Sequence, residues 1–295
     1  MVGKIYDIMP QVASKHALDV SQTVLALTKW GANGRFLTID PTKLVKVPPA
    51  VDPALATCLP ETYLTAFQVL HVDQGCKTRY QRASLRGKSV LIVGSMSNNM
   101  GKAIIELALH AGVANIYATA KQKHWQTLTS FGIMPLSPDP TEWIDRVEGT
   151  IDLVLASNGE LREDITPIHF RALHPKTGRL IMCGRRAIGN DVPTGSTQHG
   201  QASLVCSKNK EQVKMLNRSY SFDIFEQWEK NLDLCKEDLV HLLKLLQDGA
   251  IKPKILDRIP LSKVPRAHEL LESKRLSGFL ICEPWMQSKK RAVYL

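Results

Sequence analysis

Residues 87–123 read GKSVLIVGSMSNNMGKAIIELALHAGVANIYATAKQK. The run Ser89–Val93 is apolar and β-branched, which is typical of a strand buried on both faces of a parallel sheet. A loop of small and amide residues follows at Gly94–Gly101, then a helical pattern that ends at Gly112, then a second strand-like run at Ile116–Ala120. This order predicts the first half of a dinucleotide-binding sheet, with the loop holding a pyrophosphate against the helix N-terminus.

The loop departs from the usual G-x-G-x-x-G pattern of such sheets. Only Gly94 and Gly101 remain, and Asn98 and Asn99 stand where glycines are expected. Asn tolerates left-handed backbone angles, so we expect the turn to form, but its side chain occupies room that a phosphate needs. By itself the loop leaves a nucleotide site and an ordinary strand–helix turn equally open.

Basic residues follow the second strand. No acid comes after Ala120, and Lys121, Lys123 and His124 stand there instead. An acid at this position binds the ribose 2′-hydroxyl of NAD, whereas cations suit the 2′-phosphate of NADP. A solvated basic loop is the alternative, but the position directly after this loop and strand favours NADPH.

The composition indicates a soluble protein with a sizeable core. Its 295 residues are 44% hydrophobic and 22% charged, which predicts two lobes. No run approaches about 18 apolar residues and no leader opens the chain, so we expect a cytoplasmic protein without a membrane span. The six cysteines form no C-x-x-C pair and have no close His, which predicts reduced thiols and no metal site.

The chain is basic, with a net charge of +10 from 38 Lys and Arg against 28 Asp and Glu. The densest cluster is Lys77–Lys88, and a second is Lys289–Arg291. Such charge favours anionic partners, of which the cofactor is one and RNA is another. No RNA-binding motif is present, so a solubilising surface is the preferred interpretation and nucleic acid is not an expected partner.

Short alternating runs predict that residues 1–60 are rich in β-structure. The expected strands are Val24–Leu27, Arg35–Ile39 and Leu44–Val47. Helices are expected after Asp52 and from Glu61 to Leu70.

Beyond residue 123 the α/β alternation continues. Helices are expected at 125–131, 141–147 and 165–173, and strands at 151–156 and 178–183. Because ligands sit outside the carboxyl ends of parallel strands, residues after these two strands are predicted to contact the cofactor, namely Asn158, Gly159, Gly184 and Arg185. Ser221 is expected to cap a long helical region that ends at Asp248, and a strand, a helix and a strand are expected at 254–259, 266–272 and 278–282.

The sequence resembles the zinc-free medium-chain dehydrogenase/reductases, and within them the quinone oxidoreductase branch that includes zeta-crystallin and the synaptic-vesicle VAT-1 proteins. The matching segments run in family order along nearly the whole chain: residues 26–31, 59–67, 87–92, 151–154, 173–180, 217–219, 249–253 and 278–281.

The resemblance implies an α/β fold, with a Rossmann-type doubly wound parallel sheet and a partial GroES-like β-rich domain that lacks its first strands. The implied domains are a partial GroES-like domain at 1–72, a Rossmann-type NADP-binding domain at 73–252, and a return to the catalytic domain with a basic tail at 253–295.

The implied activity is hydride transfer from NADPH to a quinone or an activated alkene (enone) without zinc, in a homodimer. Tyr63 and Thr65 are pocket candidates, because the family's Thr-Ala-Tyr segment matches Thr65-Ala66-Phe67. The predicted cofactor-binding residues are Thr65, Gly94, Ser95, Asn98, Asn99, Met100, Gly101, Thr119, Lys121, Lys123, His124, Asn158, Gly159, Gly184 and Arg185.

Because the departures from the family pattern gather in the glycine loop and the front of the chain, a second hypothesis stays open. It is a non-catalytic nucleotide-binding or interaction protein on the same scaffold. RNA binding through the basic face is the third and weakest hypothesis.

Overall fold

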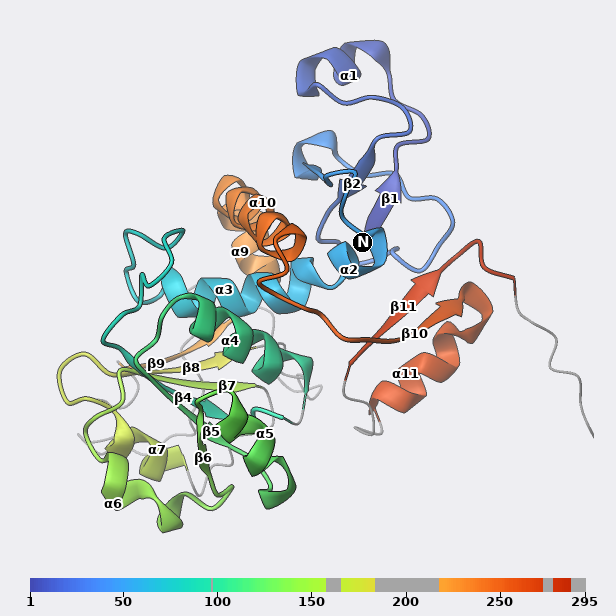
Figure 1. The fold of residues 1–295 in the computed structure, drawn as a ribbon. Coiled ribbons are helices and arrows are strands. Elements are labelled where there is room, and N and C mark those ends of the chain that lie inside the picture. The colour runs from blue at the N-terminus through green and yellow to red at the C-terminus, as the bar shows by residue number, and fades with distance from the viewer. Residues whose placement is uncertain (97, 158–165, 184–217, 273–277, 288–295) are drawn as a thin grey trace, which may run out of the picture. The chain divides into compact units, whose positions relative to one another are not determined.

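The computed structural model describes residues 1–96, 98–157, 166–183, 218–272 and 278–287 (Figure 1). The chain divides into two compact units, one made of Met1–Glu61 with Trp228–Leu295 and the other of Thr62–Gln227. These divisions fall at 61/62 and 227/228, whereas the resemblance implied boundaries at 72/73 and 252/253. The difference places the helix at 232–247 with the first unit rather than with the sheet.

The unit Thr62–Gln227 is built on a six-stranded parallel sheet of order β6-β5-β4-β7-β8-β9. The chain moves outward from the central strand β4 to β6, then returns beside β4 and moves outward again from β7 to β9. The predicted Rossmann-type doubly wound sheet is therefore confirmed. Its strands are β4 (Ser89–Val93), β5 (Asn115–Thr119), β6 (Met134–Leu136), β7 (Leu153–Ser157), β8 (Arg179–Cys183) and β9 (Ser219–Phe222).

Helices cover both faces of this sheet (Figure 1). The helices α3 (Leu64–His71) and α4 (Asn99–His110) pack together on one face, and α6 (Ile144–Val147) and α7 (Thr166–Ala172) lie on the other. The core under α6 and α7 joins strand residues to the fully buried Trp143. Three further short helices belong to this unit: α5 (Trp125–Ser130), η3 (Gln122–His124) and η4 (Pro140–Glu142).

The other unit contains two small sheets. An antiparallel sheet is formed by β1 (Val2–Lys4), β2 (Thr23–Leu25) and β3 (Val45–Lys46), and a parallel pair by β10 (Ile255–Pro260) and β11 (Phe279–Glu283). Its helices are α1 (Pro10–His16), η1 (Pro41–Lys43), α2 (Pro53–Thr57), α10 (Leu232–Gln247), η5 (Leu261–Lys263) and α11 (Val264–Glu272). A π-helical turn (Leu59–Tyr63) and α9 (Ile224–Lys230) span the unit boundaries.

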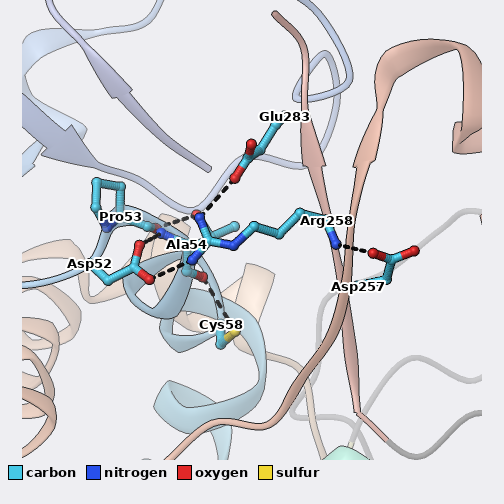
Figure 2. Close-up of polar contacts among 8 residues, drawn as sticks. Asp52, Pro53, Ala54, Cys58, Asp257, Arg258 and Glu283 are labelled. Atoms are coloured by element: carbon cyan, nitrogen blue, oxygen red, sulfur yellow. Dashed lines mark hydrogen bonds and ion pairs between the residues drawn. The ribbon is translucent and has the colours of Figure 1, made fainter. Parts of the chain in front are cut away.

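An arginine joins the early and late parts of this unit (Figure 2). Arg258 of β10 forms ion pairs with Asp52 at 2.6 Å and with Glu283 of β11 at 2.8 Å. Asp52 also caps α2, because its Oδ1 accepts the Ala54 N–H at 2.9 Å. All three charged side chains are more than one-third exposed, so each ion pair contributes little by itself. The underlying apolar contact between α2 and the β10–β11 pair is the larger contribution.

Two expectations for the elements are wrong. Residues 35–39 form no strand, and Phe36 instead contacts Tyr6 and Trp285 with its ring. Ser221 lies inside β9. The residue that caps the next helix, α9, is Asp223, whose Oδ1 accepts the Phe225 N–H at 2.8 Å.

The long helical region expected after residue 221 is also two helices. Asn231 has φ −131° and ψ 48°, which interrupts the helical backbone between α9 and α10. β1, α1 and β6 were not predicted, because three-residue strands and a seven-residue helix carry too little periodicity.

Asp152 joins the amino ends of the two central strands. Its Oδ1 accepts from Lys88 Nζ and its Oδ2 from the Ser89 N–H, both at 2.9 Å, and its own N–H donates to Ser89 O at 2.9 Å. The Asp152 side chain is 18% exposed and that of Lys88 is 42% exposed. The carboxylate therefore supplies an acceptor for a largely buried amide as well as a partner for a surface cation.

We expect Asp152→Ala to lower the free energy of unfolding by about 1–3 kcal/mol, because it leaves the Ser89 N–H without its acceptor. Lys88→Met is the matched control, since it removes only the half-exposed ammonium group and is expected to cost about 0–1 kcal/mol. Urea unfolding followed by far-UV circular dichroism measures both values. Equal losses in the two variants would contradict the role given to the Ser89 amide.

Candidate functional site

The loop after β4 is closed by hydrogen bonds to the end of β5. Gly94 has φ +70°, and its N–H donates to Thr119 Oγ1 at 2.8 Å. The N–H and the hydroxyl of Ser95 both donate to Thr119 O at 3.2 Å. Ser95 and Thr119 are buried, so these two predicted cofactor residues hold the loop in place rather than face solvent.

Gly101 allows α4 to pack on this loop. A Cβ at this position would lie 2.3 Å from the carbonyl oxygen of Ser95, so no larger residue fits without moving the backbone. Close helix–loop packing is the role of the third glycine in the usual fingerprint. Of the three glycine roles, the loop therefore retains the tight turn at Gly94 and the close packing at Gly101.

Asn98 caps the helix that follows. It is extended, with φ −149° and ψ 176°, and its Oδ1 accepts the Gly101 N–H at 2.9 Å. The turn expected here forms, at Gly94, but the asparagines do not need left-handed angles for it, because Asn98 gains a hydrogen bond in the extended cap position and Asn99 is the first residue of α4. The cap occupies one first-turn amide, whereas those of Asn99 and Met100 have no acceptor within the helix.

Two cations stand at the carboxyl end of β5. Lys121 and Lys123 are exposed, and neither ammonium group forms an ion pair or hydrogen bond with another residue in the described part of the chain. His124 is half-buried, and Trp125 Nε1 donates to Ala120 O at 2.8 Å, which fixes this turn against the strand. Because Thr119 contacts Gly94 and Ser95 directly, the two lysines follow a strand end that borders the loop.

The two pocket candidates are buried between helices. Tyr63 and Thr65 are each 2% exposed. The Tyr63 hydroxyl donates to Glu106 Oε2 of α4 at 2.9 Å, so it joins α3 to α4. Their role in a substrate pocket stays a prediction.

The four cofactor residues predicted after β7 and β8 (Asn158, Gly159, Gly184 and Arg185) lie outside the described residues. Within the described ranges no group of three or more His, Cys, Asp or Glu could hold a metal ion. None of the described helices is both long and apolar enough to cross a membrane.

Residues 137–281 match the family model described as "Zinc-binding dehydrogenase". The solved structures similar to the chain include an enoyl reductase and a quinone oxidoreductase, whose fold the chain shares. The fold that the sequence resemblance implied is thereby confirmed.

Three solved structures are similar to this chain in fold. The mycobacterial protein Rv1454c, solved in complex with NADPH, is 20% identical with a TM-score of 0.70, and the match covers 96% of this chain and 81% of that one. The CurK enoyl reductase is 22% identical with a TM-score of 0.67, and the match covers 96% of this chain and 77% of that one. A quinone oxidoreductase from Coxiella burnetii is 18% identical with a TM-score of 0.66, and the match covers 95% of this chain and 77% of that one.

Two curated relatives are similar in sequence. The polyketide synthase GfsB of Streptomyces halstedii is 23% identical over 282 residues, which are 95% of this chain and 4% of that protein. The synaptic vesicle membrane protein VAT-1 homolog of Rattus norvegicus is 22% identical over 271 residues, which are 88% of this chain and 63% of that protein. The chain thus spans less than two thirds of the length of either relative.

A buried carboxyl group next to β8 was not predicted from the sequence. Asp73 follows α3, and burial raises its pKa to about 6 against the opposing effects of Tyr220 and Arg179. Its Oδ2 and the Tyr220 hydroxyl are both buried, and Tyr220 is the first of the two groups that oppose the rise of the Asp73 pKa. Since Tyr220 pairs with Ile181 in the β8–β9 register, Arg179 and Cys183 share its face of the sheet.

The same environment raises the pKa of the Cys183 thiol to about 12, mainly through burial and also through the nearby Asp73 charge. This thiol is therefore a core group rather than a nucleophile. Nothing in the stretch around Asp73 signals its burial, because an Asp after a helix is usually a surface residue.

We expect Asp73→Asn to stabilise the protein at pH 7 by up to about 3 kcal/mol, the equivalent of a pKa raised by roughly two units. The folded state holds this proton more tightly than the unfolded chain, whose Asp has a pKa near 3.8. The wild type is therefore most stable, as far as this group is concerned, below pH 4, and loses stability as the pH rises through 6.

Urea unfolding of wild type and variant at pH 4, 5.5 and 7 measures the effect, with the gain of Asp73→Asn vanishing at the lowest pH. Asp139→Asn is the control, because hydrogen bonds from Thr141 lower the pKa of that exposed carboxyl, and no gain at pH 7 is expected. A destabilised Asp73→Asn at pH 7 would mean that the ionised carboxylate is required.

Proposed function

We propose that this protein is an NADPH-dependent oxidoreductase that transfers hydride to a quinone or an activated alkene without zinc. The observation that carries the proposal is the arrangement at the carboxyl ends of β4 and β5. There a glycine-turned loop, a helix N-terminus and two lysines that form no ion pair with any described residue follow adjacent parallel strands. An anionic dinucleotide matches this combination of amides and cations.

Particular residues suit particular parts of the cofactor. The first-turn amides of Asn99 and Met100 would receive the pyrophosphate, and Lys121 and Lys123 would bind the 2′-phosphate, with His124 beside them. Gly94 turns the loop at positive φ, and Gly101 lets α4 pack directly against it. The remaining predicted contacts, from Thr65 and from Asn158, Gly159, Gly184 and Arg185, stay part of this proposal.

The cofactor, when bound, supplies the hydride, so this chain's residues have to bind, orient and exclude water rather than perform acid–base chemistry. The described residues agree with this requirement, because burial keeps the Cys183 thiol protonated and the Tyr63 hydroxyl is hydrogen-bonded to Glu106. The quinone and enoyl reductase names of two similar structures support the substrate class. The NADPH complex of a third supports the cofactor.

A second candidate is a non-catalytic nucleotide-binding or interaction protein. The observation that favours it is the cap formed by Asn98, which takes the Gly101 N–H and places an amide side chain at the helix N-terminus. A loop satisfied in this way is stable without a ligand. Turnover separates the two candidates.

We expect the wild type to bind NADPH about tenfold to a hundredfold more tightly than NADH, since charge-assisted hydrogen bonds contribute about 1.5–3 kcal/mol. The double substitution Lys121→Ala/Lys123→Ala should remove most of that preference and leave NADH binding unchanged. Fluorescence or calorimetric titration of both cofactors measures the two affinities. Equal affinities in the wild type would show that these lysines do not meet a 2′-phosphate.

Two further variants make this titration specific. Lys77→Ala/Lys176→Ala removes the same charge from exposed lysines elsewhere in the unit and should preserve the preference. Asn98→Asp keeps a good helix cap but places a negative charge beside the pyrophosphate position, so it should weaken NADPH and NADH equally. An Asn98→Asp protein that binds both cofactors normally would place the pyrophosphate elsewhere.

Catalysis is tested by NADPH oxidation in the presence of a simple quinone or an enone, followed at 340 nm. The proposal predicts turnover that is saturable in both substrates and is reduced by Lys121→Ala/Lys123→Ala at subsaturating NADPH. NADPH binding without turnover on any quinone or enone would favour the non-catalytic candidate. Absence of NADPH binding would refute the oxidoreductase and leave the interaction protein as the remaining candidate.

A further inference from the structure

A second concave site lies in the unit formed by Met1–Glu61 and Trp228–Leu295. It is an open cavity of about 510 Å³, within the usual range for small-molecule sites. The residues that matter for its chemistry are Arg35, Pro260, Leu261, Pro284, Trp285 and Met286. None of them belongs to the proposed nucleotide site.

The apolar wall of this cavity is held in place by aromatic contacts. Trp285 is 63% exposed, and its ring meets that of Phe36 edge-to-face, with 5.5 Å between the centroids. Phe36 meets Tyr6 in turn at 5.2 Å. Because these rings come from three distant segments, the indole is positioned before any ligand arrives.

The cavity also carries one positive charge. The guanidinium carbon of Arg35 lies 4.9 Å from the centre of the Trp285 ring, and Arg35 Nε donates to Pro284 O at 3.3 Å. In the described part of the chain Arg35 has no carboxylate partner, and the residues that line the cavity include no Asp or Glu. The two terminal nitrogens of Arg35 are therefore available to an anion.

A stacked guanidinium and a flat indole favour a particular ligand. An arginine held on an aromatic face presents its planar fork, which matches a carboxylate with two parallel hydrogen bonds. The indole, the prolines and the methionine offer apolar surface to the rest of the molecule. A neutral apolar ligand would leave the cation unused, and an inorganic anion would leave the apolar wall unused.

We propose that this cavity binds a small planar carboxylate, with its ring against Trp285 and its carboxylate on the guanidinium fork of Arg35. The site lies in the unit that does not contain the nucleotide loop, and it stands whether or not the protein is an oxidoreductase.

The probe is naphthalene-2-carboxylate, titrated by calorimetry, with naphthalene-2-carboxamide as its neutral analogue of the same shape. The wild type should bind the carboxylate at least about tenfold more tightly than the amide. Arg35→Met should remove that preference while the amide binds as before, and Trp285→Ala should weaken both ligands.

Arg266→Met removes a cation of the same unit that is already paired with Glu269, and it should leave both affinities unchanged. If Arg35→Met fails to fold by circular dichroism, Arg35→Lys replaces it, since lysine keeps the charge but loses the fork and should lower the preference. No carboxylate binding by the wild type at millimolar concentration, or equal binding of both probes, would overturn the proposal.

Discussion

The parallel sheet depends on how its two halves meet at β4 and β7. Asp152 makes that junction with both carboxylate oxygens, one on the Lys88 ammonium and one on the Ser89 amide, while its own amide pairs with Ser89 O. These contacts lie at the amino ends of the strands. Because β5, β4 and β7 are parallel neighbours, their carboxyl ends lie at one edge of the sheet, and the loop after β4 and the lysines after β5 follow adjacent strands there.

At this edge of the sheet, polar groups of the loop after β4 form hydrogen bonds with other residues of the chain. Thr119 accepts from Gly94 and Ser95, and Asn98 accepts from Gly101, so most of the loop's hydrogen-bonding capacity is used internally. Glycine in place of Asn98 would leave the helix amides open to phosphate but less well capped. The Asn98 cap therefore stabilises the loop without a ligand but occupies one amide that could otherwise bind a phosphate. The catalytic and non-catalytic hypotheses differ in whether the remaining amides bind a cofactor.

The unit with Arg258 and Arg35 shows two different uses of a guanidinium group. Arg258 is neutralised by Asp52 and Glu283 and ties β10 and β11 to the start of α2 (Figure 2). Arg35 is stacked on Trp285 with no carboxylate near it among the described residues. The first is a structural cross-link between distant segments, whereas the second donates from Nε to Pro284 O and forms no ion pair within the described residues.

The sequence by itself determined the elements whose periodicity is long or whose ends are marked. The run Ser89–Val93 forms a strand that is buried at every position. Gly112 and Gly132 follow the ends of helices and adopt positive φ. Lys121 and Lys123 follow the end of a strand. Only the tertiary structure decided the rest. Asn98 is extended because its side chain accepts the Gly101 amide, and the pKa of Asp73 is raised because the folded chain buries its carboxyl. Arg35 contacts Trp285 and also Pro284, which lies 249 residues from it in the chain, because these segments converge. Local pattern encodes backbone preference, but burial, charge pairing and the contacts of a cap depend on neighbours that are distant in the chain.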